Sequence, residues 1–372
     1  MKRKRLFFDA TPLVNTHVSG VGKVLLETLR ALDKREYSTK YELYAFIPMN
    51  EAGKLDKYDF KYVKVKLLPY PHKLLSLFSR LRLSPPIDIF LGRGVYIFEN
   101  YRNWNLLFSK SITYIHDIAF RVHPEFVEAA NLRYLNGHID KWLGRTDRVV
   151  TVSESSKREI EEQLGVDGVE VVVNAADDDM YPRIKQEIDA VRKKWSIPER
   201  YYVHLSNVEP RKNIVNIVKA FALHAKQTGS KDALVLIGGD GWKNEEIYVE
   251  IEKARATGVD IIKPKAFVPD EDLPALLSGA VALIQLSWHE GFGMSVLHSL
   301  ACGTPVVAAD IPSLHEAAKG NEKNVIYVDP ADVEGASRAF AAVAELAHVS
   351  KPQNVTKWHE SIKSFERIVD DL

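Results

Sequence analysis

One short stretch in the last third of the chain puts a carboxylate beside a turn that a ligand can approach closely. Glu290 follows the apolar run 280–286, which predicts a buried parallel strand. Gly291 and Gly293 allow the backbone to lie near a ligand, and residues 294–301 predict a helix. The N–H groups and the dipole at the start of a helix suit a phosphate. A carboxylate at this place would repel the phosphate unless it faced a neutral group, such as sugar hydroxyls.

Two cations lie in a second loop of the same kind. Arg211 and Lys212 stand between a predicted strand, 201–205, and a predicted helix, 214–225, with Ser206 at the end of the strand. Cations near a helix N-terminus oppose its dipole unless an anion lies between them. The pair therefore predicts an anion site, and the alternative is an exposed basic turn.

A histidine and a glycine-containing loop occupy comparable places in the first part of the chain. His116 follows the predicted strand 111–115, and at the carboxyl end of a strand in a doubly wound sheet we expect its side chain to point into a cleft. Asp117 is expected to orient this histidine or to cap the following turn. Gly20 and Gly22 lie in a predicted strand-to-helix loop that is too short to be a dinucleotide fingerprint.

The elements that carry these residues alternate between strand and helix in two series. One series starts near the N-terminus and the other after Pro198, and each predicts a Rossmann-like half. The predicted strands are 5–8, 41–47, 62–68, 111–115, 148–152, 169–173, 201–205, 233–237, 259–262, 280–286 and 325–328, and the predicted helices include 24–32, 214–225, 294–301 and 358–372.

Composition limits the class of protein. A chain of 372 residues is comfortable for two domains. Lys plus Arg number 50, as do Asp plus Glu, so there is no overall basic field and we expect no nucleic-acid partner. The single cysteine, Cys302, rules out an internal disulfide and is expected to be buried. No apolar run reaches 18 residues and the basic start lacks a signal-peptide core, so we expect a cytosolic protein.

Charge is spread unevenly along the chain. Residues 1–100 hold 18 basic and 10 acidic side chains, a net charge of +8. Within them, the segment 73–83 places Lys73, Arg80 and Arg82 next to a leucine-rich face. Such a segment can lie on an anionic membrane surface at the inner face of the cell membrane, or it can pack as a helix of an N-terminal domain. A run of acids, 177–179, has no further ligands at a suitable spacing and is expected to form a solvated loop rather than a metal site.

The stretch around Glu290 resembles a known family. The pattern is a Glu, then Phe-Gly, then a second Glu eight positions after the first, and then Ala-x-Gly-x-Pro-Val, and the matching residues are Glu290, Phe292, Gly293, Gly303, Pro305 and Val306. His298 stands where the second Glu is expected. This arrangement is similar to the donor site of retaining glycosyltransferases of family 4, and in particular of mannosyl- and rhamnosyltransferases that build bacterial surface polysaccharides.

The resemblance implies an α/β fold of the GT-B type. Two Rossmann-like domains would face a cleft, and the last helix, anchored by Trp358, would cross back to the N-terminal domain. The expected domains are residues 1–182 with 356–372 on the acceptor side, and residues 183–355 on the nucleotide-sugar side.

It also implies roles for single residues. Glu290, His116, Lys212 and Arg211 would be catalytic, with the two cations neutralising the leaving diphosphate. Donor binding would use Gly20, Gly22, Ser206, Arg211, Lys212, Phe267, Val268, Glu290, Gly291, Phe292, Gly293, Met294 and His298. In the family the second Glu holds the ribose hydroxyls, so we expect His298 to relax ribose recognition and to permit a deoxyribose nucleotide.

The implied reaction transfers a hexose from a nucleotide-diphosphate sugar, of the GDP-mannose or dTDP-rhamnose type, to a hydroxyl of a glycan or lipid-linked glycan. The anomeric configuration would be retained, with neither a cofactor nor a metal ion. Two alternatives stay open: a non-catalytic GT-B subunit, and a nucleotide-sugar epimerase or phosphorylase of the same fold.

Overall fold

The computed structural model describes residues 3–16, 18–71, 74, 77–78, 85–349 and 355–372. Lys73, Arg80 and Arg82 of the predicted amphipathic segment lie outside these residues. Contacts divide the chain into two units. The first contains Met1–Ile118, Arg133–Asn174 and Trp358–Leu372, and the second contains Ala119–Leu132 and Ala175–Lys357.

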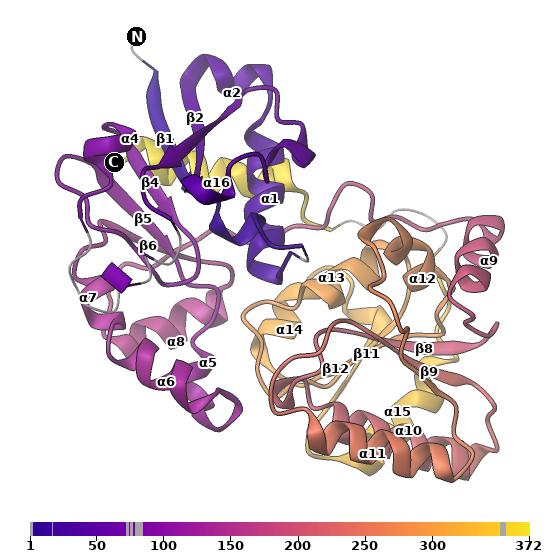
Figure 1. The fold of residues 1–372 in the computed structure, drawn as a ribbon. Coiled ribbons are helices and arrows are strands. Elements are labelled where there is room, and N and C mark those ends of the chain that lie inside the picture. The colour runs from indigo at the N-terminus through magenta and orange to yellow at the C-terminus, as the bar shows by residue number, and fades with distance from the viewer. Residues whose placement is uncertain (1–2, 17, 72–73, 75–76, 79–84, 350–354) are drawn as a thin grey trace. The chain divides into compact units, whose positions relative to one another are not determined.

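The first unit is built on a sheet in which every adjacent pair of strands is parallel (Figure 1). The strands lie in the order β3-β2-β1-β4-β5-β6-β7. Their bounds are β1 Lys4–Asp9, β2 Tyr41–Pro48, β3 Val63–Leu68, β4 Val95–Phe98, β5 Lys110–Tyr114, β6 Arg148–Thr151 and β7 Glu170–Val171. The helices that begin in this unit's segments are α1 Gly20–Leu32, α2 Arg35–Lys40, α4 Asp88–Leu91, α7 Ile139–Leu143, α8 Glu154–Leu164 and α16 Trp358–Asp370.

Alternating side chains of β1 fill the two faces of this sheet. Phe7 stacks on Tyr44 and Tyr96, with ring centroids 4.9 and 4.6 Å apart. Phe8 faces the other way and packs against Phe365 of α16 at 6.0 Å. The C-terminal helix therefore completes the core of the N-terminal unit, as predicted.

The second unit contains a parallel sheet with helices on both faces (Figure 1). The strands lie in the order β10-β9-β8-β11-β12-β13. Their bounds are β8 Tyr201–Leu205, β9 Ala233–Ile237, β10 Ile261–Ile262, β11 Leu283–Gln285, β12 Val306–Ala309 and β13 Val325–Val328. The helices that begin in its segments are α5 Ala119–Val122, α6 Ala129–Asn136, α9 Lys185–Lys194, α10 Ile214–Thr228, α11 Glu245–Ala256, α12 Leu273–Gly279, α13 Met294–Ala301, α14 Pro312–Ala317 and α15 Val333–Val343.

Several predicted bounds differ from the structure. The predicted glycine-containing loop up to Gly22 is wrong at its end, because α1 already begins at Gly20. Ser19 caps this helix by accepting a hydrogen bond from the N–H of Gly22 at 3.3 Å, which draws both glycines into the first turn. At the start of α8, the Ser153 hydroxyl caps the helix by accepting a hydrogen bond from the Ser156 N–H at 3.0 Å.

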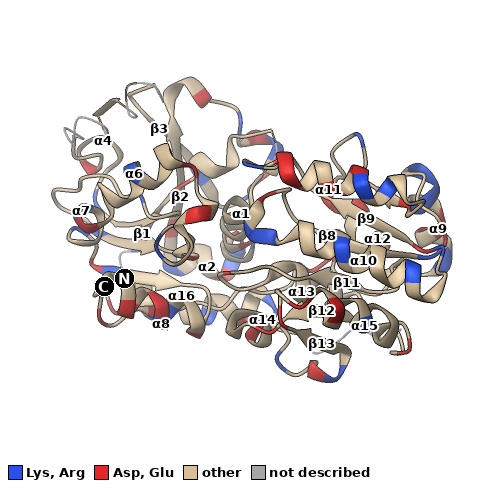
Figure 2. Ribbon diagram, turned by 90° about the horizontal axis from the view of Figure 1, so that it is seen from below, with Lys and Arg blue, Asp and Glu red and all other residues tan. Residues whose placement is uncertain are grey.

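The fold buries the lone cysteine and leaves the charged residues dispersed. Cys302 is buried, and burial raises the pKa of its thiol to about 12. Both signs of charge are spread over both units (Figure 2). Among the described residues, no helix is long and apolar enough to cross a membrane.

Candidate functional site

Two loops of the second unit meet at the carboxyl edge of its sheet. β8 and β11 are parallel neighbours, with Leu283 opposite Val203, so the chain leaves both strands at the same edge. The first loop ends in the short 3-10 turn Pro210–Lys212, and the second contains Glu290. The N–H of Trp288 donates to the carbonyl of Arg211 at 2.9 Å and joins the two loops.

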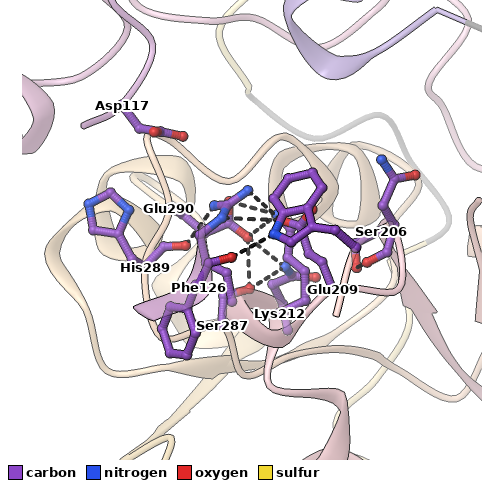
Figure 3. A network of polar contacts seen from close by, with 12 residues as sticks. Asp117, Phe126, Ser206, Glu209, Lys212, Ser287, His289 and Glu290 are labelled. Atoms are coloured by element: carbon purple, nitrogen blue, oxygen red, sulfur yellow. Dashed lines mark hydrogen bonds and ion pairs between the residues drawn. The ribbon is translucent and has the colours of Figure 1, made fainter. Parts of the chain in front are cut away.

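Glu290 is the centre of a buried polar network (Figure 3). Lys212 Nζ lies 2.7 and 2.9 Å from its two carboxylate oxygens, and Arg211 Nη1 lies 3.2 Å from Oε2. Gln285 Nε2 and the Ser287 hydroxyl each donate to Oε1 at 2.8 Å. Charged and neutral donors thus surround this carboxylate, which satisfies the requirement that a buried charge be paired.

The balance of forces keeps Glu290 ionised. Burial would raise its pKa, but the charges of Lys212 and Arg211, with hydrogen bonds from Lys212 and Ser287, outweigh burial and hold the pKa well below its ordinary value. The network therefore presents a permanent anion to the two cations.

Arg211 is shared between two carboxylates. Its Nη2 lies 2.9 Å from Oε1 of Glu209, a residue that is also buried, while Nη1 donates to the carbonyl of His289 at 2.8 Å. Two cations are thus balanced by two carboxylates within this cluster. A ligand phosphate that bound here would have to take hydrogen bonds from Arg211 or Lys212 that now go to Glu209 or Glu290.

The loop after β8 is fixed by the amide of Asn213. This residue has a left-handed φ of 57°, and its Nδ2 donates to the carbonyls of Leu286 and Pro330 at 2.9 and 2.8 Å. Asn tolerates this conformation better than most residues do. The amide therefore ties the start of α10 to the end of β11, where the Glu290 turn begins.

Ser206 is bound to a neutral histidine. Burial lowers the pKa of His204 to about 4, so the imidazole is uncharged near neutral pH. Its Nδ1 lies 2.7 Å from the carbonyl of Ile284 and its Nε2 lies 2.6 Å from the Ser206 hydroxyl. The carbonyl can only accept, which assigns the proton to Nδ1 and makes the hydroxyl the donor to Nε2.

The turn between Glu290 and α13 requires glycine. Gly293 has a φ of 113°, and a Cβ added to it would lie 2.5 Å from Leu314 Cδ2. Gly291 and Phe292 are buried, whereas Met294 at the start of α13 is half-buried. The predicted helix 294–301 is confirmed at both ends.

His298 lies beside an acid that the sequence did not place there. The expectation of a solvated loop at 177–179 is wrong for Asp177, which is buried. His298 Nε2 lies 3.8 Å from Asp177 Oδ2, and both side chains are at least nine-tenths buried. Met180 fixes the backbone at this point, because its N–H donates to the Asp177 carbonyl at 3.0 Å. A carboxylate is thus present next to position 298, supplied from elsewhere in the chain.

Two further residues of the second unit, Phe267 and Val268, were predicted to bind the donor. Phe267 is half exposed and Val268 is buried. Their predicted role beside a nucleotide base stays a prediction. Among the described residues, no group of three or more His, Cys, Asp and Glu side chains could hold a metal ion.

In the first unit, His116 is held by a glutamate that the sequence analysis missed. Its Nε2 lies 3.0 Å from Glu99 Oε2. The Tyr101 hydroxyl donates to the carbonyl of Asp117 at 2.7 Å, which fixes the backbone after His116. Gly20 and Gly22 stand in the first turn of α1, where a Cβ on Gly22 would lie 2.6 Å from Val18 Cγ1.

The structure therefore brings Arg211, Lys212 and Glu290 into one cluster, and it adds residues with no predicted role. The sequence could have predicted a role for Gln285 and Ser287, because the first is a polar residue within the apolar run 280–286 and the second directly follows that run. Glu99 could have been found because it directly follows the apolar run of β4. No comparable feature of the sequence indicates a role for Glu209.

Part of the chain is similar in sequence to known proteins. Residues 187–359 match the family model described as glycosyl transferases group 1. The O-antigen chain mannosyltransferase B of Escherichia coli is 29% identical over 254 residues, which cover 68% of this chain and 63% of that protein. The chain thus spans less than two thirds of that relative's length.

Solved structures show the fold. Sucrose-phosphate synthase from Thermosynechococcus elongatus has a TM-score of 0.71 at 15% identity, over 100% of this chain and 97% of that chain. Anabaena HepE in complex with UDP-glucose has a TM-score of 0.65 at 15% identity, over 100% and 99% of the two chains. The chain has the predicted GT-B fold, and its residues 187–359 are similar to the glycosyl transferases group 1 family.

Proposed function

We propose that this chain is a glycosyltransferase that moves a hexosyl group from a nucleotide-diphosphate sugar to a hydroxyl of a glycan or lipid-linked glycan. The observation that carries the proposal is the cluster of Arg211, Lys212 and Glu290 at the carboxyl edge of a parallel sheet, within a glycosyl transferases group 1 domain. The names of the relatives add support, since the Escherichia coli protein is described as an O-antigen chain mannosyltransferase.

The proposed chemistry is mainly electrostatic. Negative charge builds on the departing diphosphate, and Lys212 and Arg211 would stabilise it once they turn from Glu290 to the phosphates. Glu290 would then accept hydrogen bonds from sugar hydroxyls. The leaving phosphate would take the proton of the attacking hydroxyl on the same face of the sugar, so the anomeric configuration is retained.

The side-chain cations would supply the charge that a divalent ion supplies in other transferases. We therefore propose metal-independent turnover without a cofactor. Equal rates in a chelator and in added Mg²⁺ would agree with this, and a rate that falls when EDTA is added and returns with Mg²⁺ would contradict it.

We also propose that the protein acts in the cytoplasm at the inner membrane face. Between residues 61 and 110 there are nine Lys and Arg but only two acids, Asp88 and Glu99, and both acids are buried. Asp88 accepts from the N–H groups of Leu107 and Phe108, which brings four exposed apolar side chains, Ile89, Phe90, Leu107 and Phe108, to one corner of the first unit. A basic stretch of sequence together with exposed apolar side chains suits an anionic bilayer. Stronger cosedimentation with anionic than with zwitterionic vesicles would support this placement.

The function is tested by nucleotide release from GDP-mannose, dTDP-rhamnose and UDP-glucose, with and without a glycan acceptor. Lys212→Ala and Glu290→Ala should each lower turnover at least about 100-fold, comparable to the loss of one oxyanion donor. Lys194→Ala is the matched control, because Lys194 pairs with Asp272 at 2.6 Å in the same unit and takes no part in the Glu290 network. Wild-type turnover in either site variant would contradict the site assignment.

The same assay separates the alternatives. Product formed without an acceptor, or only with free phosphate, would point to an epimerase or a phosphorylase. If none of UDP, GDP, dTDP and ADP binds at millimolar concentration, the chain is a non-catalytic subunit.

A further inference from the structure

A buried contact in the first unit determines which nitrogen of His116 is available to a ligand. Glu99 directly follows β4 and His116 lies two residues beyond β5, and these strands are parallel neighbours with Phe98 opposite Thr113. The two side chains therefore leave the sheet at the same edge. Glu99 Oε2 lies 3.0 Å from His116 Nε2, and the two side chains are 2% and 13% exposed.

One ring contact and one backbone contact restrict His116. Tyr114 stacks on it with ring centroids 5.9 Å apart. Burial and the nearby Glu99 raise the pKa of Tyr114 well above its usual value, so the phenol stays protonated. The Ser156 hydroxyl donates to the carbonyl of His116 at 3.3 Å and holds the backbone from the α8 side.

The partner atom decides the tautomer. A carboxylate oxygen can only accept a hydrogen bond, so Nε2 carries the proton and donates a hydrogen bond to Glu99. In the neutral imidazole this leaves Nδ1 with a lone pair. An unpaired Glu99 would be costly at this depth, so the pair also stabilises the carboxylate.

We propose that Glu99 is a positioning residue that holds His116 as the Nε2–H tautomer, so that Nδ1 accepts a hydrogen bond from a hydroxyl of the sugar or of the acceptor. The inference rests on the proposed glycosyl transfer. Glu99 itself need not touch the substrate. His116 orients the hydroxyl but takes no proton from it, because the leaving phosphate receives that proton.

Glu99→Gln tests the inference with little change in shape. The glutamine amide can donate as well as accept, so it no longer imposes one tautomer. Asp88→Asn is the matched control, because Asp88 is an equally buried acid of the same unit whose carboxylate accepts from the backbone N–H groups of Leu107 and Phe108. Histidine ¹⁵N NMR of the full chain reads the tautomer of His116, whose signals are those that disappear in His116→Asn.

The expected result has three parts. His116 is the Nε2–H tautomer in wild type and in Asp88→Asn, and becomes a mixture of tautomers in Glu99→Gln. With GDP-mannose and a glycan acceptor, Glu99→Gln lowers kcat at least about tenfold, the loss typical for a partner that orients a functional imidazole. KM for the donor changes less than kcat.

Other outcomes overturn the inference. They are an Nδ1–H tautomer in wild type, an unchanged tautomer with full turnover in Glu99→Gln, or an equal loss of turnover in Asp88→Asn. If wild type turns over none of the donors, the proposed function fails by itself. The NMR measurement then still decides whether Glu99 sets the tautomer.

Discussion

At the scale of single residues, the chemistry of the second unit depends on charges that neutralise one another. Glu290 accepts hydrogen bonds from Lys212, Arg211, Gln285 and Ser287, and the pairing keeps it ionised. The sequence predicted the anion site from Arg211 and Lys212, because two cations at a helix start are unfavourable alone. It did not predict that Glu290 would pair with them, because that depends on the pairing of β8 with β11.

The charge of Glu290 should be visible in the pH dependence of stability. Its folded-state pKa lies below the ordinary value of 4.5, so its stabilising contribution is complete above about pH 4.5 and is lost as the pH falls through the lower folded-state value. Glu290→Gln should therefore be less stable than wild type at pH 7, and the difference should shrink below pH 4.5. Urea unfolding between pH 3 and 7 measures this. A difference that grew on acidification would contradict the assigned direction.

Position 298 gives a second test at this scale. His298→Glu would place a second buried carboxylate about where Nε2 now lies, 3.8 Å from Asp177 Oδ2, and two such charges repel each other. We expect this single variant to be destabilised by at least about 1 kcal/mol. The double variant Asp177→Asn/His298→Glu should recover most of the loss.

Nucleotide binding by these two variants tests the expected relaxation of ribose recognition. Calorimetry with GDP and dTDP compares them with wild type. If the double variant gains affinity for GDP over dTDP, position 298 contacts the ribose. Unchanged affinities in a folded double variant would remove His298 from the donor site.

At the scale of elements, the sequence predicted well those strands and helices whose pattern is contained in a few consecutive residues. The strands Tyr201–Leu205, Ala233–Ile237 and Val325–Val328 and the helix Met294–Ala301 have the predicted bounds. Each is a run of apolar residues or a periodic segment with a clear stop. β4, only four residues long, was missed because its apolar residues follow glycines that suggest a loop. Because β4 was not predicted, Glu99 was not recognised as a residue at the carboxyl end of a strand.

Alanine substitutions at two glycines test whether the turn before α13 requires glycine. Gly293→Ala should distort the turn, because φ is 113° and the new Cβ would lie 2.5 Å from Leu314 Cδ2. Gly258→Ala is the control for backbone strain alone, since Gly258 has a φ of 88° and nothing within 4 Å of an added Cβ. We expect the control to cost about 1–2 kcal/mol of unfolding free energy and Gly293→Ala to cost more. Only Gly293→Ala should also lower turnover, and equal effects of the two changes would show that the Leu314 contact is unimportant.

At the scale of the whole molecule, the resemblance predicted what local patterns cannot. Nothing in the sequence of α16 by itself shows that it packs on β1, some 350 residues earlier along the chain. The contact is specific, since Phe365 meets Phe8 and Asp370 accepts from the Tyr41 hydroxyl at 2.9 Å. Long-range packing of this kind depends on the complete fold.

Phe365→Ala should therefore destabilise the first unit, although it lies near the end of the sequence. Loss of a buried phenylalanine costs about 3–5 kcal/mol. Hydrogen exchange should show faster opening of β1 and β2, while β8 and β11 keep the protection of wild type. Uniform loss of protection in both units would mean that they unfold as one.

The place of α16 also sets an order of events during synthesis. The first unit is assembled from segments on both sides of the second, and Phe8 of β1 lacks its partner Phe365 until α16 has been made. Ala175–Lys357 leaves the ribosome before α16 does, so most of the second unit can fold first. The nascent chain then lacks this packing partner for the time needed to translate about 190 residues, roughly ten to forty seconds at ordinary rates. For that interval we expect the N-terminal segment to be a client for chaperones, even though it is translated before the second unit.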